Sequence, residues 1–279
     1  MATSRKTTPR TSTRRTDAEA GRALITGASA GIGAELAREF ARHGHALTLV
    51  ARRREALAAL ADELTRAHGV DVKVIAQDLA QPGGPAAVVK AAQAGGQVID
   101  ILVNNAGIVD TGPFARASTD RLLALIDLNV RAMTEMCSRL LPGMVERGAG
   151  RILNVSSLSA FQPVPTMGTY AASKVFVLSL TEALSEELHG TGVSVTALCP
   201  GFTQTDMMDE IQAGSAAVRK LPQQMLSKPA DVAALGYRAL MSGQTVAVPG
   251  LPNQLTAAWA QVTPRWLTRY VAGIATRGG

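Results

Sequence analysis

The segment RALITGASAGIG, residues 22–33, carries the strongest fold signal in this chain of 279 residues. A short apolar run ends at Thr26, and a glycine-rich stretch then leads into a helical pattern. Glycines in a turn between a strand and a helix permit positive φ angles and a close approach of backbone to ligand, and the amides at the helix start attract a pyrophosphate. The segment predicts a dinucleotide-binding turn with contacts from Gly27, Ser29, Gly31, Ile32 and Gly33.

Short apolar runs alternate with longer segments of helical periodicity from Arg22 onward. This alternation is typical of βα units around a parallel sheet. We expect one α/β domain, a Rossmann-type doubly wound parallel sheet of about seven strands with helices on both faces. Strands are predicted near 22–26, 46–50, 72–76, 99–103, 151–155, 193–199 and 244–248. Helices are predicted over 31–43, 53–68, 119–147 and 168–189.

The charge distribution separates the N-terminus from the rest of the chain. The net charge is +6, but residues 1–16 hold five basic residues and no acid, so the remainder is nearly neutral. Residues 1–21 are predicted to be a disordered basic tail, with a transit peptide or a polyanion contact as alternatives. The balanced body predicts no nucleic-acid partner. With 47% hydrophobic residues it can bury a core, and residues 22–249 are predicted to be the dinucleotide-binding and catalytic domain.

The C-terminal residues 250–279 predict an amphipathic helical extension of two short helices, the second starting near Pro264. Both tryptophans, Trp259 and Trp266, fall in this extension and must bury against some surface. That surface is the protein's own substrate cleft, a partner subunit of a homodimer or homotetramer, or an anionic membrane contacted peripherally. The short apolar stripe and the few arginines favour the first two surfaces.

The two cysteines and one long uncharged stretch argue against a disulfide-bonded protein, a metalloprotein and a membrane-spanning protein. Cys137 and Cys199 have neither disulfide-framework nor metal-ligand spacing, so we expect no metal site and a reduced, cytoplasmic setting. The uncharged stretch 239–264 is interrupted by glycines and prolines, so no transmembrane helix is predicted.

Further motifs follow the glycine-rich turn in a fixed order. They are Asn104-Asn105-Ala106-Gly107, Asn129 within Leu-Asn-Val, Ser157 at a predicted strand end, Tyr170-Ala-Ala-Ser-Lys174, and Pro200-Gly201. With the TGxxxGxG spacing of the turn, this series resembles the classical branch of the short-chain dehydrogenase/reductase family over about residues 22–248. The resemblance implies an oxidoreductase that moves a hydride between a nicotinamide and a carbonyl or alcohol.

The Tyr170 and Lys174 pair has a chemical reason of its own. Residues four apart share one face of a helix. A free tyrosine has a pKa of about 10, and a nearby ammonium favours the phenolate, which predicts a Tyr170 pKa lowered toward neutrality. Ser157 comes off a strand end onto the same cleft, where its hydroxyl can bond the reacting carbonyl.

The resemblance implies the catalytic roles. Tyr170 exchanges a proton with the substrate oxygen and Ser157 orients that oxygen. Lys174 lowers the pKa of Tyr170 and holds the nicotinamide ribose, and Asn129 positions a water beside Lys174. Other cofactor contacts are implied at Asp78, Leu79, Asn104, Ala106, Gly107, Pro200, Gly201, Thr203 and Thr205.

The choice of cofactor is predicted from the end of the second strand. An NAD-specific protein usually places an acid there to bond the ribose 2′-hydroxyl, but this chain has Ala51 followed by Arg52. A guanidinium binds a 2′-phosphate with charge-assisted bonds, so NADP(H) is favoured over NAD(H) with Arg52 as its contact. The alternative is that residues 52–54 form only a solvated basic face.

The substrate pocket is predicted to be apolar, with Phe161 and Met167 beside Ser157 and Tyr170. This composition suits a small apolar carbonyl or alcohol. Two other functions remain open. An epimerase or dehydratase would use the same Tyr and Lys pair, although the spacing of the turn disfavours it. A non-catalytic dinucleotide sensor would not need Ser157, Tyr170 and Lys174 together.

Overall fold

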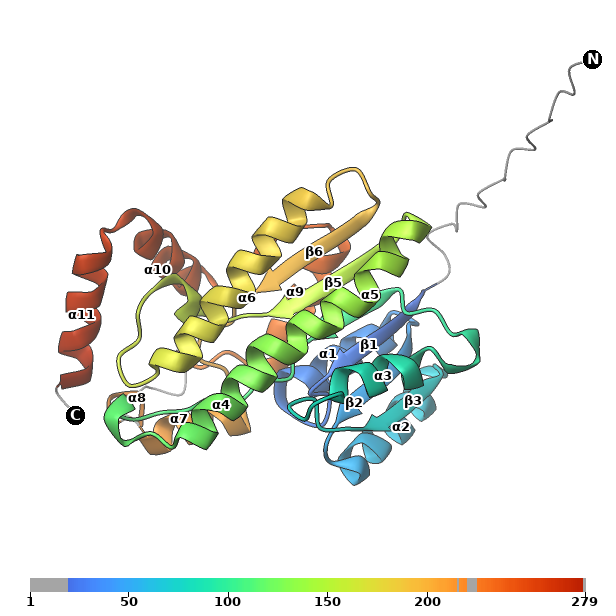
Figure 1. The fold of residues 1–279 in the computed structure, drawn as a ribbon, viewed down its shortest axis with the longest axis horizontal. Coiled ribbons are helices and arrows are strands. Elements are labelled where there is room, and N and C mark those ends of the chain that lie inside the picture. Colours follow the sequence, from blue (N-terminus) through green and yellow to red (C-terminus); the bar gives the residue numbers. More distant parts are fainter. Residues whose placement is uncertain (1–19, 215, 220–224, 278–279) are drawn as a thin grey trace, which may run out of the picture.

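The computed structural model describes residues 20–214, 216–219 and 225–277, so residues 1–19 of the tail predicted over 1–21 lie outside the described residues. Seven parallel strands form one sheet in the order β3-β2-β1-β4-β5-β6-β7, which confirms the predicted fold class (Figure 1). The strands are β1 (Arg22–Thr26), β2 (Ala46–Ala51), β3 (Val72–Ala76), β4 (Ile101–Asn104), β5 (Gly150–Val155), β6 (Val193–Leu198) and β7 (Val246–Ala247).

The central strands are apolar on both sides because helices cover both faces of the sheet. In β1, for example, Leu24 packs into one core cluster and Ile25 into the other. The strand order reverses between β1 and β4, which pair through Ile25 and Val103. The carboxyl ends of these strands diverge into helices on opposite faces, and a doubly wound sheet binds its ligand at that crevice.

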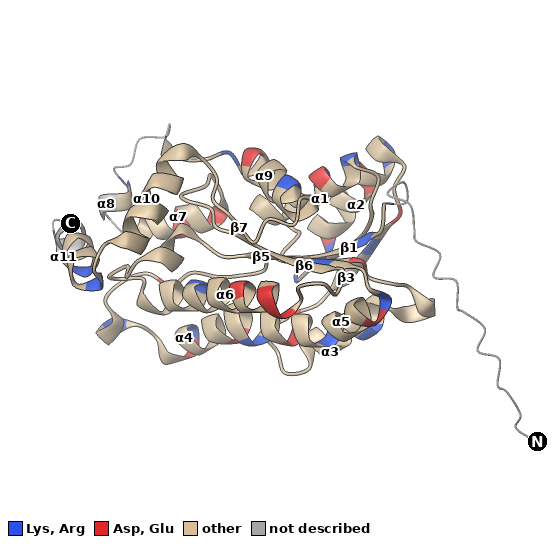
Figure 2. Ribbon diagram, turned by 90° about the horizontal axis from the view of Figure 1, so that it is seen from above, with Lys and Arg blue, Asp and Glu red and all other residues tan. Residues whose placement is uncertain are grey.

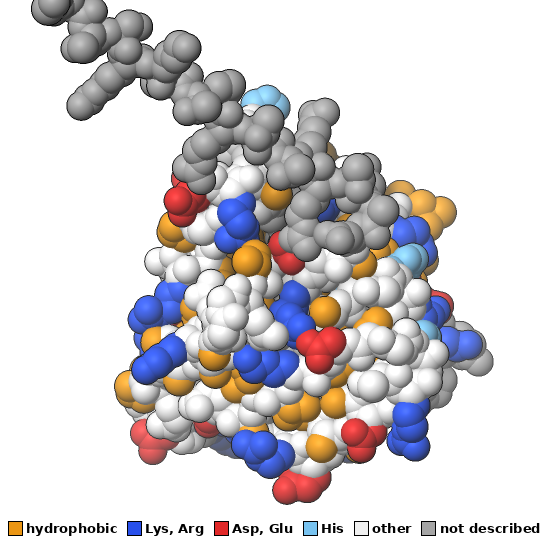
Figure 3. Space-filling view, turned by 90° about the vertical axis from the view of Figure 1, so that its right-hand side faces the viewer, with side chains coloured by type: hydrophobic (Ala, Val, Ile, Leu, Met, Phe, Trp, Pro, Cys, Tyr) orange, Lys and Arg blue, Asp and Glu red, His pale blue; other side chains and the backbone are white. Residues whose placement is uncertain are grey.

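The helices lie in two layers with the sheet between them (Figure 2). One layer contains α1 (Gly31–Arg42), α2 (Arg54–His68) and α9 (Pro229–Met241), and the other contains α3 (Gly84–Ala92), α5 (Met133–Arg147) and α6 (Gly168–Glu187). In α2, which falls within the helix predicted over 53–68, a stripe of Leu57, Leu60 and Leu64 is buried in the core. Viewed from the right of Figure 1, basic and acidic side chains are interspersed on the surface (Figure 3).

The helix predicted over 119–147 changes winding in its middle. α4 (Thr119–Ile126) leads into a π-helical segment, Asp127–Ala132, which continues directly as α5. π segments inside α-helices are rare and are frequent at functional sites. The π-helical segment contains Asn129, and the Asn129 side chain is buried in the interior of the protein.

The chain ends in helices that follow the sheet. α7 (Asp206–Gly214) and α8 (Ala216–Arg219) follow β6, and α10 (Leu251–Val262) and α11 (Arg265–Arg277) follow β7. The last two occupy the predicted positions, with Pro264 directly before α11. Within the described ranges, no helix is both long enough and apolar enough to cross a membrane.

Candidate active site

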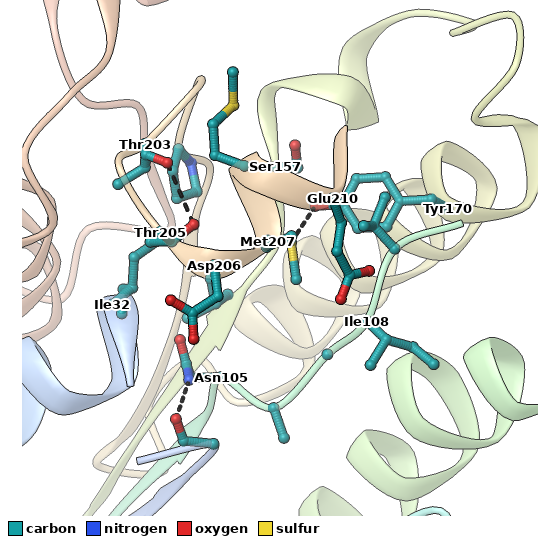
Figure 4. Close-up of a pocket in the computed structure, with 18 of the residues that line it drawn as sticks. Ile32, Asn105, Ile108, Ser157, Tyr170, Thr203, Thr205, Asp206, Met207 and Glu210 are labelled. Carbon is teal, nitrogen blue, oxygen red and sulfur yellow. Dashed lines mark hydrogen bonds between the residues drawn. The ribbon is translucent and has the colours of Figure 1, made fainter. Parts of the chain in front are cut away.

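A cavity of about 580 Å³ opens at the carboxyl ends of the strands (Figure 4). The turns after β1, β2, β3, β4, β5 and β6 all contribute to its wall, together with α6 and α7. The structure therefore brings most of the predicted site residues together. Those that line the cavity are Gly27, Ser29, Gly31, Ile32, Arg52, Asp78, Leu79, Ala106, Gly107, Ser157, Met167, Tyr170, Lys174, Pro200, Gly201, Thr203 and Thr205.

Four predicted residues do not line this cavity: Gly33, Asn104, Asn129 and Phe161. Asn104 is buried in the sheet, where its amide donates to Asn154 Oδ1 at 2.9 Å. Phe161 packs against the core cluster that contains Ala160 and Leu178 instead of facing the predicted pocket. It belongs to a single 3₁₀ turn, Leu158–Phe161, whose later neighbour Gln162 faces the cavity.

The glycine-rich turn is held close to the first helix. A Cβ at Gly33 would lie 2.3 Å from the carbonyl oxygen of Gly27, so only glycine permits this contact. Gly27 itself has a φ of +67°, in the left-handed region. Ala30 precedes α1 without a side-chain cap, and the first turn of α1 has no acid. Gly31 and Ile32 line the cavity, and no side-chain cap and no acid of the first turn compete for the amides that begin α1.

Thr26 joins this turn to the end of β4. Its hydroxyl donates to Val103 O at 3.2 Å and accepts hydrogen bonds from the amides of Asn105 and Ala106 at 3.0 and 3.1 Å. The Asn105 side chain donates in turn to Thr26 O at 3.0 Å and to Gly27 O at 3.3 Å, the second of which is drawn in Figure 4. The two strand ends on either side of the crevice are thereby fixed relative to each other.

Two arginines border the glycine-rich turn. Arg52 and Arg53 both line the cavity and are exposed. Arg53 donates from its guanidinium to Ser29 O at 3.3 Å and contacts Ser29 Oγ at 3.4 Å. The predicted contact at Arg52 thus has a second cation beside it, which the sequence prediction did not assign.

Tyr170 and Ser157 meet at the inner end of the cavity. A hydrogen bond with Ser157 lowers the pKa of Tyr170, but burial of the phenol outweighs it, and the net pKa is raised above the usual value. The predicted lowering by Lys174 is therefore wrong for this structure, because desolvation penalises the phenolate more strongly. The Tyr170 hydroxyl also donates to Met207 Sδ at 3.9 Å, from α7 (Figure 4).

Lys174 lies beneath Tyr170 and is buried, with 4% of its surface exposed. Its ammonium donates to Val155 O at 3.0 Å, and it lies 5.6 Å from the centre of the Tyr170 ring. Burial lowers the pKa of Lys174 to about 8, so the charge of this side chain changes within an accessible pH range. Ser156 holds the same helix by donating to Lys174 O at 2.8 Å.

Asn129 holds the loop after β4 through its side-chain amide. Its Oδ1 accepts from Ile108 N and its Nδ2 donates to Ile108 O, both at 2.9 Å. Its Nδ2 also contacts Ser173 Oγ at 3.2 Å. A Cβ at Gly107 would lie 3.2 Å from Asn129 Oδ1 and 3.5 Å from Lys174 Nζ, so both groups flank Gly107.

Asp206 and Glu210 of α7 also line the cavity, although the sequence analysis did not select them (Figure 4). Glu210 accepts from Arg121 at 2.9 Å, and Arg121 also donates to Val109 O at 2.8 Å. Arg121 of α4 thereby links α7 to the loop after β4 at the rim of the cavity. The Asp-x-x-x-Glu spacing was the available signal, but no helix was predicted there, and the spacing alone does not indicate which way the side chains face. Among the described residues, no cluster of His, Cys, Asp and Glu side chains could hold a metal ion.

The residues present fit a dinucleotide. The cavity combines cations after β2 that suit a ribose phosphate, an uncapped helix start after β1 that suits a pyrophosphate, and the hydroxyl pair of Ser157 and Tyr170 at the far end. This arrangement follows the three chemical parts of such a ligand in order along the carboxyl edge of the sheet.

Known proteins show the same fold and sequence pattern. The short chain dehydrogenase family model matches residues 22–216. The ketoacyl reductase HetN of Nostoc sp. is 37% identical over 185 residues, which span 66% of this chain and 64% of that protein. A short-chain dehydrogenase from Sphingobium yanoikuyae in complex with NADPH has a TM-score of 0.78 and 34% identity, covering 91% of this chain and 94% of that one. A short chain dehydrogenase/reductase from Burkholderia phymatum in complex with NAD has a TM-score of 0.76 and 28% identity, covering 86% and 92%.

The family match begins at β1, includes the glycine-rich turn and continues beyond α7. The seven-stranded sheet with helices on both faces agrees with these structural neighbours. The chain therefore belongs to the short-chain dehydrogenase family of oxidoreductases.

Proposed function

We propose that this protein is an NADP(H)-dependent oxidoreductase that interconverts an apolar carbonyl compound and its alcohol, with Tyr170 as the acid and base. The observation that carries the proposal is the meeting of Tyr170, Ser157 and Lys174 in one cavity with the glycine-rich turn. A dinucleotide sensor would need the turn but not the hydroxyl pair of Ser157 and Tyr170. The proposed catalytic domain is the predicted one, residues 22–249.

The proposed cofactor site extends along the cavity from Arg52 to Thr205. The amides at Gly31 and Ile32 would hold the pyrophosphate, and Arg52 and Arg53 would hold the 2′-phosphate. The position that carries an acid in NAD-specific proteins is Ala51 here. Solved neighbours contain NADPH in one case and NAD in another, so the preference for NADP(H) rests on these side chains.

Tyr170 would donate its phenolic proton to the carbonyl oxygen of the substrate while the bound nicotinamide supplies the hydride. The raised pKa of Tyr170 keeps the phenol protonated at neutral pH, which suits the direction of reduction. Ser157 would donate a second hydrogen bond to the same oxygen and hold it beside Tyr170. Lys174 would hold the ribose hydroxyls with its ammonium, which is charged below pH 8 or so.

The proposed substrate is apolar because the inner wall of the cavity is apolar. Val109, Met167 and Ile211 belong to one buried cluster with Tyr170, and Val164 and Met207 pack against it. All five side chains line the cavity. A ketone, an aldehyde or the keto group of an acyl chain fits this wall better than a phosphorylated sugar does. The name of the ketoacyl reductase relative is consistent with a carbonyl of this kind.

The test follows the absorbance of the reduced nicotinamide with NADPH and NADH against a panel of apolar ketones and aldehydes. We expect turnover with at least one carbonyl and a higher kcat/KM with NADPH. Tight NADPH binding without turnover of any carbonyl or alcohol would favour a sensor. Conversion of substrate with no net change in NADPH would favour an epimerase or a dehydratase.

A further inference from the structure

Helix α10 turns its large apolar side chains outward. Leu251, Leu255, Trp259 and Val262 recur at helical spacing along one face, with between 42% and 83% of each residue exposed. The opposite side presents small residues, and Ala257 and Ala260 are buried there. A helix on the surface of a globular protein ordinarily has the reverse arrangement.

Helix α11 extends this apolar surface. Trp266 and Tyr270 lie one turn apart and are 64% and 61% exposed, whereas Thr268 is buried. We call six exposed apolar or aromatic residues of the two helices the terminal face: Leu251, Leu255, Trp259, Val262, Trp266 and Tyr270. A monomeric protein rarely exposes such a series of large apolar side chains unless the surface binds something.

The two helices that carry the terminal face have no negatively charged side chain. Residues 232–279 contain no Asp or Glu, and Arg265 and Arg269 are exposed next to Trp266 and Tyr270 in the sequence. Figure 2 shows basic but no acidic residues on α11, whereas both signs are interspersed on the surface in Figure 3. The binding partner must therefore be apolar and also carry negative charge.

Two other occupants agree less well with these observations. None of the described residues of α10 and α11 lines the cavity, so the face does not cover the substrate site. A two-fold contact with a second copy places like surfaces together. Arg265 and Arg269 would then approach their own equivalents, and no acid on these helices would neutralise them.

We propose that the terminal face binds the surface of a membrane that contains anionic phospholipids. Leu255, Trp259 and Val262 would enter the boundary between headgroups and acyl chains, as the apolar side of an interfacial helix does. Trp266 and Tyr270 are amphipathic rings that prefer the same depth. Arg265 and Arg269 would extend to the lipid phosphates.

Tryptophan fluorescence of the full chain tests the proposal directly, because both tryptophans belong to the terminal face. Phosphatidylcholine vesicles with added phosphatidylglycerol should shift the emission to shorter wavelength at low ionic strength. Pure phosphatidylcholine vesicles should produce a much smaller shift, and high salt should reverse the effect. An emission spectrum that these vesicles leave unchanged would overturn the proposal.

Co-sedimentation with the same anionic vesicles measures separately how much the arginines and the apolar side chains contribute to binding. Arg265→Gln with Arg269→Gln should weaken partitioning by about thirtyfold, the product of two contributions of about fivefold each. Leu255→Ser with Trp259→Ser should weaken it by about a hundredfold. A matched control, Phe114→Ser with Arg116→Gln, removes an exposed aromatic and an exposed arginine elsewhere and should bind like the wild type.

Two results would contradict the proposal that the terminal face binds anionic vesicles. If both terminal-face variants retain wild-type binding, another part of the chain, such as the basic residues 1–16, holds the vesicles and the proposal is wrong. If Leu255→Ser with Trp259→Ser reduces the oligomer size in sedimentation velocity and vesicles have no effect on the wild type, a second copy occupies the face. Unchanged turnover of a water-soluble substrate and an unchanged Tm show that these variants are folded.

Discussion

The Tyr170 hydroxyl donates a hydrogen bond to the Met207 thioether across 3.9 Å. The two side chains come from α6 and α7, so this contact joins the proposed acid to the helix that follows β6. Sulfur is a weak acceptor, and a carbonyl oxygen is a stronger one. A substrate carbonyl held by Tyr170, as we propose, would lie against Met207, and we expect the size of the Met207 side chain to limit the groups that the carbonyl can carry.

Replacing Met207 should change substrate preference. Met207→Ala should raise the ratio of kcat/KM for a bulky ketone over that for a slim one by about tenfold or more, the scale expected for removing methylene-sized groups from a pocket. Met207→Leu keeps the volume and should leave the ratio close to that of the wild type. Steady-state kinetics with a matched pair of ketones measures this ratio. An unchanged ratio in Met207→Ala would show that the substrate does not contact Met207.

Removing the Tyr170 hydroxyl should remove the proton donor but retain the fold. Tyr170→Phe should lower kcat by about 10²–10⁴-fold, the range for loss of a positioned acid or base. NADPH affinity and Tm should change little, because the ring remains packed in its apolar cluster. Single-turnover kinetics together with an NADPH titration tests both parts. Turnover within a few-fold of the wild type would exclude Tyr170 as the acid.

Arg52 should discriminate between the two nicotinamide cofactors. Arg52→Ala should weaken NADPH by about 10–150-fold, equivalent to about 1.5–3 kcal/mol for a hydrogen bond to a charged group, with a smaller effect on NADH. Arg54→Ala is the matched control, because Arg54 begins α2 and does not line the cavity. Calorimetric Kd values for both cofactors provide the measurement. Equal affinity of the wild type for NADPH and NADH would contradict the prediction.

The buried Lys174 should make stability depend on pH in the alkaline range. Its pKa falls from 10.5 in the unfolded chain to about 8 in the fold, so the folded state releases this proton first. The buried ammonium then destabilises the fold by up to about 3 kcal/mol below pH 8, and this penalty disappears as the pH rises toward 10.5.

Lys174→Met should therefore unfold at higher urea concentration than the wild type at neutral pH. The difference in the free energy of unfolding should shrink as the pH rises through the same range. Lys90→Met, at an exposed lysine of α3, should show a difference that does not vary with pH. A constant difference for Lys174→Met would mean that Lys174 is not desolvated as the structure indicates.

His45 should produce a loss of stability in acid. Burial lowers its pKa below 6.5, and its ring nitrogens lie 3.0 Å from Gly21 O and 3.1 Å from Tyr237 Oη. The neutral ring thus contributes stability that is complete above pH 6.5 and is lost as the pH falls toward the lower pKa of the folded state. His45→Gln should flatten the dependence of Tm on pH below neutrality. His68→Gln, at an exposed histidine of α2, should leave that dependence unchanged.

The fold was predictable because a parallel sheet buried on both faces produces continuous apolar runs. The turn at residues 27–33 was predictable for a similar reason, since its glycines are required by local backbone geometry. The last strand was predicted over 244–248, but it forms only at Val246–Ala247, where two residues pair with Ala197 and Leu198 of β6.

Side-chain directions and pKa values that depend on packing between distant segments were less predictable from the sequence. Phe161 was expected in the pocket, but the direction of a single 3₁₀ turn is set by the packing of α6 and β6 around it. The pKa of Tyr170 was expected to fall because Lys174 is near in sequence, whereas burial dominates in the fold. Glu210 lies at the rim of the cavity because of the way α7 is oriented. Its bond to Arg121, which is 89 residues earlier in the chain, helps to set that orientation.

The close approach at Gly201 has a consequence for how this protein and its relatives can diverge. A Cβ at Gly201 would lie 2.7 Å from the side chain of Asn253, whose amide donates to Pro249 O at 2.7 Å. The loop at Pro200-Gly201, which borders the cavity, therefore packs tightly against the first turn of α10. A homologue that gains a side chain at position 201 therefore needs the side chain at position 253 to turn aside or to be smaller. Variation of these two positions across the family should be correlated accordingly.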